Sequence, residues 1–120
     1  MLAEVLVVVP TLGQRPDFLR QTLTSIRSQE KPVDVVIVGP QSAPGLAALA
    51  QEFDMDMIPD PGSLTTAIEA GVATALPHHD FVTWLNDDDL LTSGSLATTH
   101  AALQEDPRAV LAYGACEYID

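Results

Sequence analysis

The polar stretch Asn86 to Asp89, which contains three adjacent aspartates, is the part of this sequence best suited to chemistry. Neighbouring carboxylates repel one another unless water screens their charges or a cation binds between them. Hard oxygen ligands suit Mg²⁺ or Mn²⁺ better than Zn²⁺. The alternative is a solvated acidic loop that caps the next helix. The apolar residues on both sides, Phe81 to Leu85 and Leu90-Leu91, favour a binding site, because a solvated loop is rarely held at both ends.

The elements that must position this stretch alternate between strands and helices. Phe81 to Leu85 is a continuous β-prone run, which predicts a strand buried on both faces. Further strands are expected at residues 5–9, 33–38, 55–58 and 109–113, with 116–119 extending the last or starting another, and helices at 17–29, 46–53, 63–75 and 92–106. The expected caps are Asp17, Ser63 or Thr65, and Thr92 or Ser93, and the third helix is expected to bury Leu64, Ile68, Val72 and Ala75.

This alternation predicts an α/β fold with a mainly parallel sheet and right-handed crossovers. The order 3-2-1-4 places the first and fourth strands side by side at the switch point, where ligands bind beyond the carboxyl ends. Four loops are therefore expected to meet at one cleft: Pro10-Thr11, Gly39 to Ser42, Asp60 to Thr65 and Asn86 to Asp89.

The composition fits one domain of 120 residues, 47% of them hydrophobic. The formal net charge of -12 opposes nucleic-acid binding and anionic membranes, and no direct membrane insertion is expected. An anionic substrate would need a metal ion to offset this field. The single cysteine, Cys116, excludes an internal disulfide, is expected to be buried, and fits a reducing, cytoplasmic location.

The sequence lacks the motifs of other common nucleotide-binding and metal-binding proteins. The loop from Thr11 to Pro16 has neither the Gly-Lys-Ser/Thr of a P-loop nor a GxGxxG fingerprint. His78 and His79 are expected to face solvent, His100 to lie on a helix surface, and no Cys/His metal set is expected. A metal-dependent nucleotidyl transferase is a weaker alternative, because its glycine-rich, basic opening loop is absent.

The chain resembles the inverting GT-A glycosyltransferases of family 2 over nearly its whole length. The motifs that carry the resemblance are the strand ending in Pro10-Thr11, the helix Phe18 to Gln29, the segment Gly62 to Gly71, and Trp84 to Leu91, which is similar to a Trp-Leu-Asn-x-Asp-Asp form of the DXD signature. The resemblance implies a GT-A-like, Rossmann-related three-layer domain that binds a nucleotide-diphosphate sugar. It also implies that Mn²⁺ or Mg²⁺ bridges the diphosphate and the DXD carboxylate.

Carried over to this sequence, the resemblance implies metal ligands at Asp88 and Asp89. It implies substrate contacts from Pro10, Thr11, Arg15, Ser63, Thr66, Asn86 and Asp87. The acidic pair that family members usually carry after the second strand is replaced by Gly39-Pro40. Thr66 and Glu69 stand where a bacterial subgroup of the family commonly has Asp and Asn.

The resemblance further implies glycosyl transfer of the hexosyltransferase type, with a saccharide or lipid-linked saccharide as the acceptor. The sequence ends where the family's acceptor half, which supplies the catalytic base, would begin, so no catalytic residue is assigned. We therefore expect residues 1–120 to be the N-terminal nucleotide-sugar-binding part of a longer enzyme. The alternative is a reduced, non-catalytic binding or interaction domain of the same fold.

Overall fold

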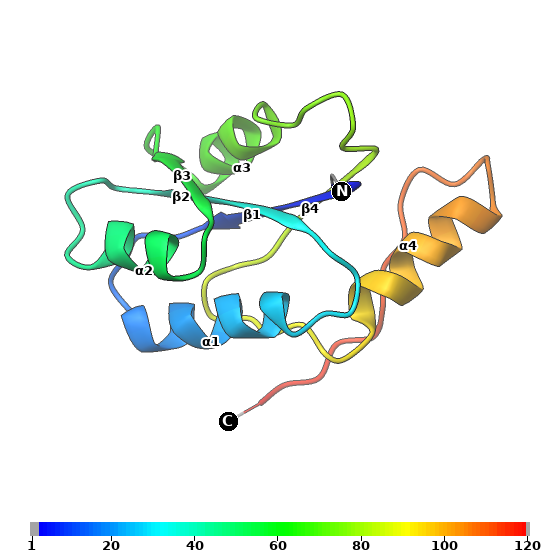
Figure 1. Cartoon of the computed structure of the whole chain (residues 1–120), viewed down its shortest axis with the longest axis horizontal. Helices are drawn as coiled ribbons and strands as arrows, with labels where there is room; N and C mark the ends of the chain where they lie inside the picture. Colours follow the sequence, from blue (N-terminus) through cyan, green and yellow to red (C-terminus); the bar gives the residue numbers. More distant parts are fainter. Residues whose placement is uncertain (1–2, 120) are drawn as a thin grey trace.

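A parallel sheet of four strands forms the centre of the computed structural model, which describes residues 3–119 (Figure 1). The strands are β1 (Val5–Pro10), β2 (Asp34–Gly39), β3 (Asp56–Pro59) and β4 (Phe81–Trp84). Their order is β3-β2-β1-β4, and every neighbouring pair is parallel. The predicted strand order and the central place of the first strand are therefore confirmed.

Helices cover both faces of this sheet and complete three layers (Figure 1). They are α1 (Pro16–Arg27), α2 (Leu46–Glu52), α3 (Leu64–Val72) and α4 (Ser95–Glu105). Alternate residues of β1 point to opposite faces. Val7 and Val9 pack with residues of α1, α2 and the start of α4, whereas Leu6 and Val8 pack with Ala67 of α3.

The buried face of α3 differs from the predicted one. Ala67 and Gly71 are buried, whereas Leu64 and Val72 are exposed. A Cβ atom built on Gly71 would lie 2.3 Å from Cγ1 of Val8, so only a residue without a side chain fits between helix and strand. Close approach of the backbones, rather than bulky apolar side chains, decides how α3 sits on the sheet.

The strand β4 is half exposed, so the prediction of burial on both faces is wrong. Its burial alternates along the strand, and Val82 and Trp84 are exposed, because β4 lies at the edge of the sheet. Within the part of the chain that the structure describes, residues 109–113 and 116–119 form no strand. Val110 and Leu111 are largely exposed, since this segment leaves α4 beyond Pro107 without pairing to a neighbouring strand.

Two helix caps also differ from the prediction. Arg15 is the residue before α1, and Pro16 is the first residue of the helix. Asp17 therefore lies inside the first turn, where its negative charge interacts favourably with the helix dipole. Gly94 precedes α4 with a φ of 76°, a conformation that glycine adopts without strain. The predicted cap at Ser63 is confirmed.

The solvent exposure of three residues also differs from the prediction. His79 has a side chain only 4% exposed and contacts Asp34, whereas His100 is buried with its ring edge-on against Phe81 and its Nε2 3.3 Å from Glu4. Cys116 is exposed, because it lies in the unpaired C-terminal segment. Within residues 3–119, no helix is long and apolar enough to cross a membrane.

Candidate functional site

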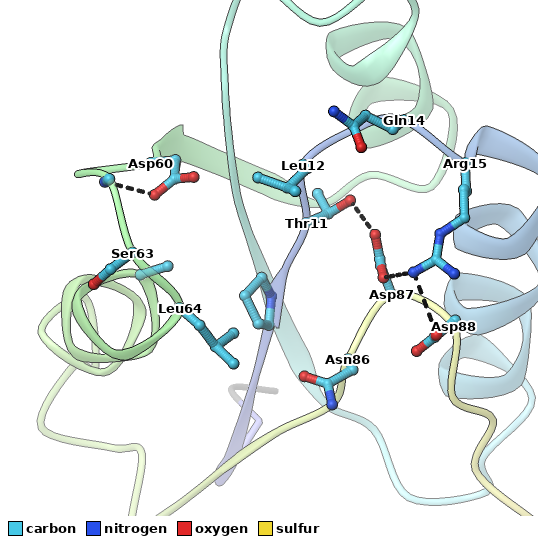
Figure 2. A pocket seen from close by; sticks show the side chains of 13 residues that line it. Thr11, Leu12, Gln14, Arg15, Asp60, Ser63, Leu64, Asn86, Asp87 and Asp88 are labelled. Atoms are coloured by element: carbon cyan, nitrogen blue, oxygen red, sulfur yellow. Dashed lines mark hydrogen bonds and ion pairs between the residues drawn. The ribbon is translucent and has the colours of Figure 1, made fainter.

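A cavity of about 440 Å³ opens at the carboxyl edge of the sheet, where the predicted cleft was expected (Figure 2). Its walls come from the loop after β1, the loop between β3 and α3, and the loop after β4. The lining residues include Pro10, Thr11, Leu12, Gln14, Arg15, Asp60, Ser63, Leu64, Asn86, Asp87 and Asp88. Residues 39–42 are not among them, so three of the four expected loops meet here.

Thr11 fixes the position of one carboxylate in this cavity. The Thr11 hydroxyl donates to Oδ2 of Asp87 at 2.7 Å and accepts from the backbone N–H of Gly13 at 3.0 Å. The backbone N–H of Thr11 continues the sheet by donating to the carbonyl of Val38 at 2.9 Å. Because Thr11 is buried and both its hydroxyl and its backbone N–H are hydrogen-bonded, Asp87 is held against the end of β1.

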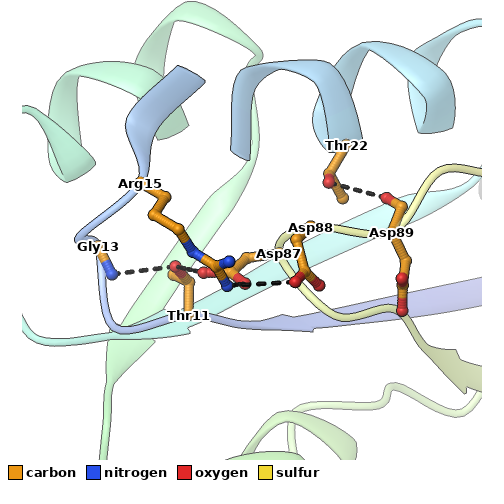
Figure 3. Close-up of polar contacts among 7 residues, drawn as sticks. All are labelled: Thr11, Gly13, Arg15, Thr22, Asp87, Asp88 and Asp89. Carbon is orange, nitrogen blue, oxygen red and sulfur yellow. Dashed lines mark hydrogen bonds and ion pairs between the residues drawn. The ribbon is translucent and has the colours of Figure 1, made fainter. Parts of the chain in front are cut away.

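Arg15 joins Asp87 to the next carboxylate along the chain. One guanidinium nitrogen lies 3.3 Å from Oδ1 of Asp87 and 3.3 Å from Oδ2 of Asp88 (Figure 3). The two carboxylates thus point at one position of positive charge. Without that charge their mutual repulsion would push them apart.

Asp89 lies outside the cavity. Its backbone carbonyl accepts a hydrogen bond from the Thr22 hydroxyl of α1 at 2.8 Å (Figure 3). Two residues further on, the backbone N–H of Leu91 donates to the Ser25 hydroxyl at 3.1 Å. Thr22 is fully buried. These contacts anchor the loop after β4 to α1, and they leave Asp87 and Asp88, rather than Asp88 and Asp89, on the cavity wall.

The two predicted contacts from α3 form a helix cap. The Ser63 hydroxyl accepts from the backbone N–H of Thr66, and Oγ1 of Thr66 accepts from the backbone N–H of Ser63. Ser63 still lines the cavity, whereas Thr66 does not. The capping box therefore engages both hydroxyls that the sequence analysis had assigned to substrate contacts.

Sequence reasoning expected the loop from Asp60 to Thr65 at this cleft, but it assigned no ligand contact to the residues of the far wall. Leu12 and Leu64 line it although both are about 60% exposed (59% and 60%), and Asp60 lines it at the end of β3. The position of Asp60 follows from its place directly after a strand, which puts it at the carboxyl edge of the sheet. The two leucines gave no signal, since an apolar residue next to a helix is usually assigned to the core.

A second cluster, Asp34, His78 and His79, lies at the opposite, amino edge of the sheet and was also missed. One potential ligand atom from each residue lies within 4.8 Å of the others. Nδ1 of His79 accepts the backbone N–H of Leu76 at 2.9 Å, so Nε2 carries the proton that it donates to Asp34 at 2.6 Å. That nitrogen has no lone pair free for a metal, and the contact instead ties the start of β2 to the segment before β4.

Comparisons with known proteins identify the class to which this fold and cavity belong. The profile described as "Glycosyl transferase family 2" matches residues 6–119, and the chain belongs to that family. No curated protein matches the sequence.

Similar solved structures show the same fold. S. aureus TarS 1-349 has a TM-score of 0.74 and 19% identity over 85% of this chain and 32% of its own. The mannosyltransferase PcManGT from Pyrobaculum calidifontis, solved with GDP-Man and Mn²⁺, has a TM-score of 0.71 and 21% identity over 87% of this chain and 33% of its own. TarS 1-349 solved with UDP has a TM-score of 0.70 and 18% identity over 85% of this chain and 32% of its own. This chain thus spans about a third of those chains, and it shares their GT-A glycosyltransferase fold.

Proposed function

We propose that this chain binds the nucleotide-diphosphate part of a sugar donor, with a divalent cation, for glycosyl transfer to an acceptor hydroxyl. The observation that carries the proposal is the pair Asp87 and Asp88, which converge on one positive charge in a cavity at the carboxyl edge of a family 2 fold. Two structural neighbours add support, because their structures contain GDP-Man with Mn²⁺ and UDP.

The residues at this edge fit Mn²⁺ or Mg²⁺. Both ions prefer oxygen ligands, and Mg²⁺ commonly binds one or two carboxylates while substrate phosphates and water complete its shell. Asp88 is the primary candidate ligand, because its side chain is more open to the cavity than that of Asp87, which Thr11 already binds. When bound, the cation would neutralise charge that develops on the diphosphate leaving group.

The other polar residues of the cavity would position the nucleotide. Thr11 holds Asp87 in place, and Arg15, which is half exposed, can turn from the carboxylates to a phosphate when a cation takes its place. Pro10 and Asn86 border the same space, and Ser63 lies at the N-terminal end of α3, where backbone N–H groups favour an anion. These residues would bind and orient the nucleotide. We assign no residue of this chain as the catalytic base that deprotonates the acceptor hydroxyl.

Calorimetric titration with Mn²⁺, with and without GDP or UDP, tests the proposal. The wild-type chain is expected to bind Mn²⁺ weakly alone and at least about tenfold more tightly with a nucleoside diphosphate, and linkage requires the effect to be reciprocal. Asp88→Asn is expected to abolish this coupling.

Asp89→Asn is the matched control, because it removes the same charge from the same loop outside the cavity. It is expected to keep the coupling. Equal losses in both variants would place the metal elsewhere in the loop. Absence of coupling in the wild type with either nucleotide would favour the non-catalytic binding or interaction domain instead.

A further inference from the structure

A carboxylate that takes no part in the proposed metal site lies at the opposite end of the cavity. Asp60 lines the cavity at the end of β3, whereas Asp87 and Asp88 follow β4 (Figure 2). The sheet order places β2 and β1 between them, so the two ends are three strand spacings apart. At about 4.8 Å between the backbones of neighbouring strands, the backbones of β3 and β4 are about 14 Å apart. The side chains that extend into the cavity shorten this distance.

This length fits a nucleoside diphosphate laid across the strand ends. With the diphosphate at Asp87 and Asp88, the ribose would lie near the end of β1 and the base would reach β3. Apolar surface lies on the way, because Leu12 and Leu64 both line the cavity and both are exposed. The flat faces of a nucleobase suit such walls.

Asp60 is prepared to accept hydrogen bonds from this ligand. Its Oδ1 accepts the N–H of Gly62 at 2.8 Å, which fixes the carboxylate, and its backbone N–H donates to the carbonyl of Gly39 at 3.2 Å. Among residues 3–119, no lysine, arginine or histidine forms an ion pair with Asp60. A carboxylate has about four acceptor positions, so both oxygens can still accept from a ligand.

The neighbouring strand end supplies no competing side chain. Gly39 terminates β2, and a Cβ atom there would lie 2.7 Å from the Leu46 side chain and 3.0 Å from the carbonyl oxygen of Thr11. A side chain at this position would require both Leu46 and Thr11 to move. Asp60 is the carboxylate that borders the cavity from the β2 and β3 side.

We propose that Asp60 reads the nucleobase and makes the site prefer guanine over uracil, an inference that rests on the proposed nucleotide function. Guanine presents two adjacent donors, N1–H and the 2-amino group, which one carboxylate can accept together. Uracil presents a single N–H between two carbonyl oxygens, and those oxygens would repel the carboxylate. A good two-point contact to a base discriminates by about tenfold or more.

The test is calorimetry with Mn²⁺ present, in which GDP, IDP and UDP are compared on wild type, Asp60→Asn and Asp56→Asn. IDP lacks only the 2-amino group of GDP. Wild type is expected to bind GDP at least about tenfold more tightly than IDP or UDP. Asp60→Asn is expected to bring the three affinities within about threefold, because the amide replaces an acceptor with a donor.

Asp56→Asn removes the same charge from the exposed start of β3, and it is expected to keep the wild-type preference. Equal affinity of the wild type for GDP and UDP would overturn the inference while leaving the proposed function intact. So would an equal loss of all three nucleotides in Asp60→Asn, which would assign Asp60 to the ribose. Failure of every nucleotide to bind with Mn²⁺ would overturn both proposals.

Discussion

Arg15 occupies the position at which the proposed cation would act. Its guanidinium contacts Asp87 and Asp88 at 3.3 Å each, and the side chain is half exposed, so it can leave without disturbing the core. Exposed ion pairs of this kind contribute about 0.2–1 kcal/mol each. A divalent cation must compete with this contact, and a phosphate offers the displaced arginine a new partner.

Arg15→Gln is therefore expected to change two affinities in opposite directions. Binding of Mn²⁺ alone should strengthen by about threefold to tenfold, because the competing ion pairs are gone. Binding of the diphosphate in the presence of Mn²⁺ should weaken, because a phosphate partner is lost. Both affinities are measured by calorimetry.

Arg20→Gln is the control for Arg15→Gln, since it makes the same charge change on α1. Arg20 binds Glu52 away from the cavity, and this hydrogen bond lowers the pKa of the Glu52 carboxyl. Both affinities should stay near wild type. If Arg15→Gln behaves in the same way, Arg15 neither competes with the cation nor contacts the nucleotide.

At the scale of elements, the fit of α3 against β1 sets one wall of the cavity. The helix approaches Val8 so closely that Gly71 is required, and this approach carries the cap residue Ser63 and the exposed Leu64 to the cavity edge. Helix propensity alone favours alanine over glycine by about 1 kcal/mol. The packing opposes that preference, because a Cβ would lie 2.3 Å from a fully buried valine methyl group.

Gly71→Ala is expected to destabilise the fold by about 1–3 kcal/mol, the usual range for overpacking. Urea unfolding measures the effect. Val8→Ala in the same chain should recover part of the loss, so that the double variant is more stable than the sum of the single changes predicts.

Gly114→Ala provides the comparison, because a Cβ there would meet nothing within 4 Å, and its effect should stay within about 0.5 kcal/mol. A Gly71→Ala variant more stable than wild type would show that helix propensity outweighs the contact.

At the scale of the whole molecule, charge imbalance is the dominant feature. The chain carries 17 acidic residues against 5 basic ones, and several of the acids lie at the cavity. Self-repulsion lowers the stability of a compact state with such a charge, and salt screens it. The same field opposes an anionic nucleotide, so binding is expected to depend on the cation.

Raising NaCl from about 10 mM to about 100 mM shortens the Debye length from about 30 Å to about 10 Å. We expect this to raise the unfolding temperature at pH 7 by about 2–6 °C, which is roughly 0.5–1 kcal/mol for a chain of this size. Scanning calorimetry at the two salt concentrations measures the shift.

Glu105→Lys, at the exposed end of α4, changes the net charge from -12 to -10 and should respond less to salt than wild type. An unfolding temperature that is independent of salt in both chains would show that local ion pairs, rather than net charge, set the electrostatic contribution.

The residue pattern determined the architecture. Continuous apolar runs at residues 5–9 and 35–38, separated by amphipathic segments, predicted parallel strands, and the right-handed crossover rule favoured an open doubly wound sheet. The order expected for such a sheet is the one observed. The order in turn brought the ends of β1 and β4 together, so Thr11 and Asp87 could be expected in one cleft. These features follow from local hydrophobic periodicity and from the connectivity of the elements, both of which can be read directly from the sequence.

Tertiary structure decided which side chains share that cleft. Asp87 and Asp89 are two residues apart and chemically identical, but hydrogen bonds from Thr11 and Thr22 turn one toward the cavity and hold the other's backbone against α1. The exposure of Leu64 and the covered side chain of His79 depend in the same way on how closely neighbouring elements approach. Such distances arise from packing between segments far apart in the chain, and no local pattern encodes them.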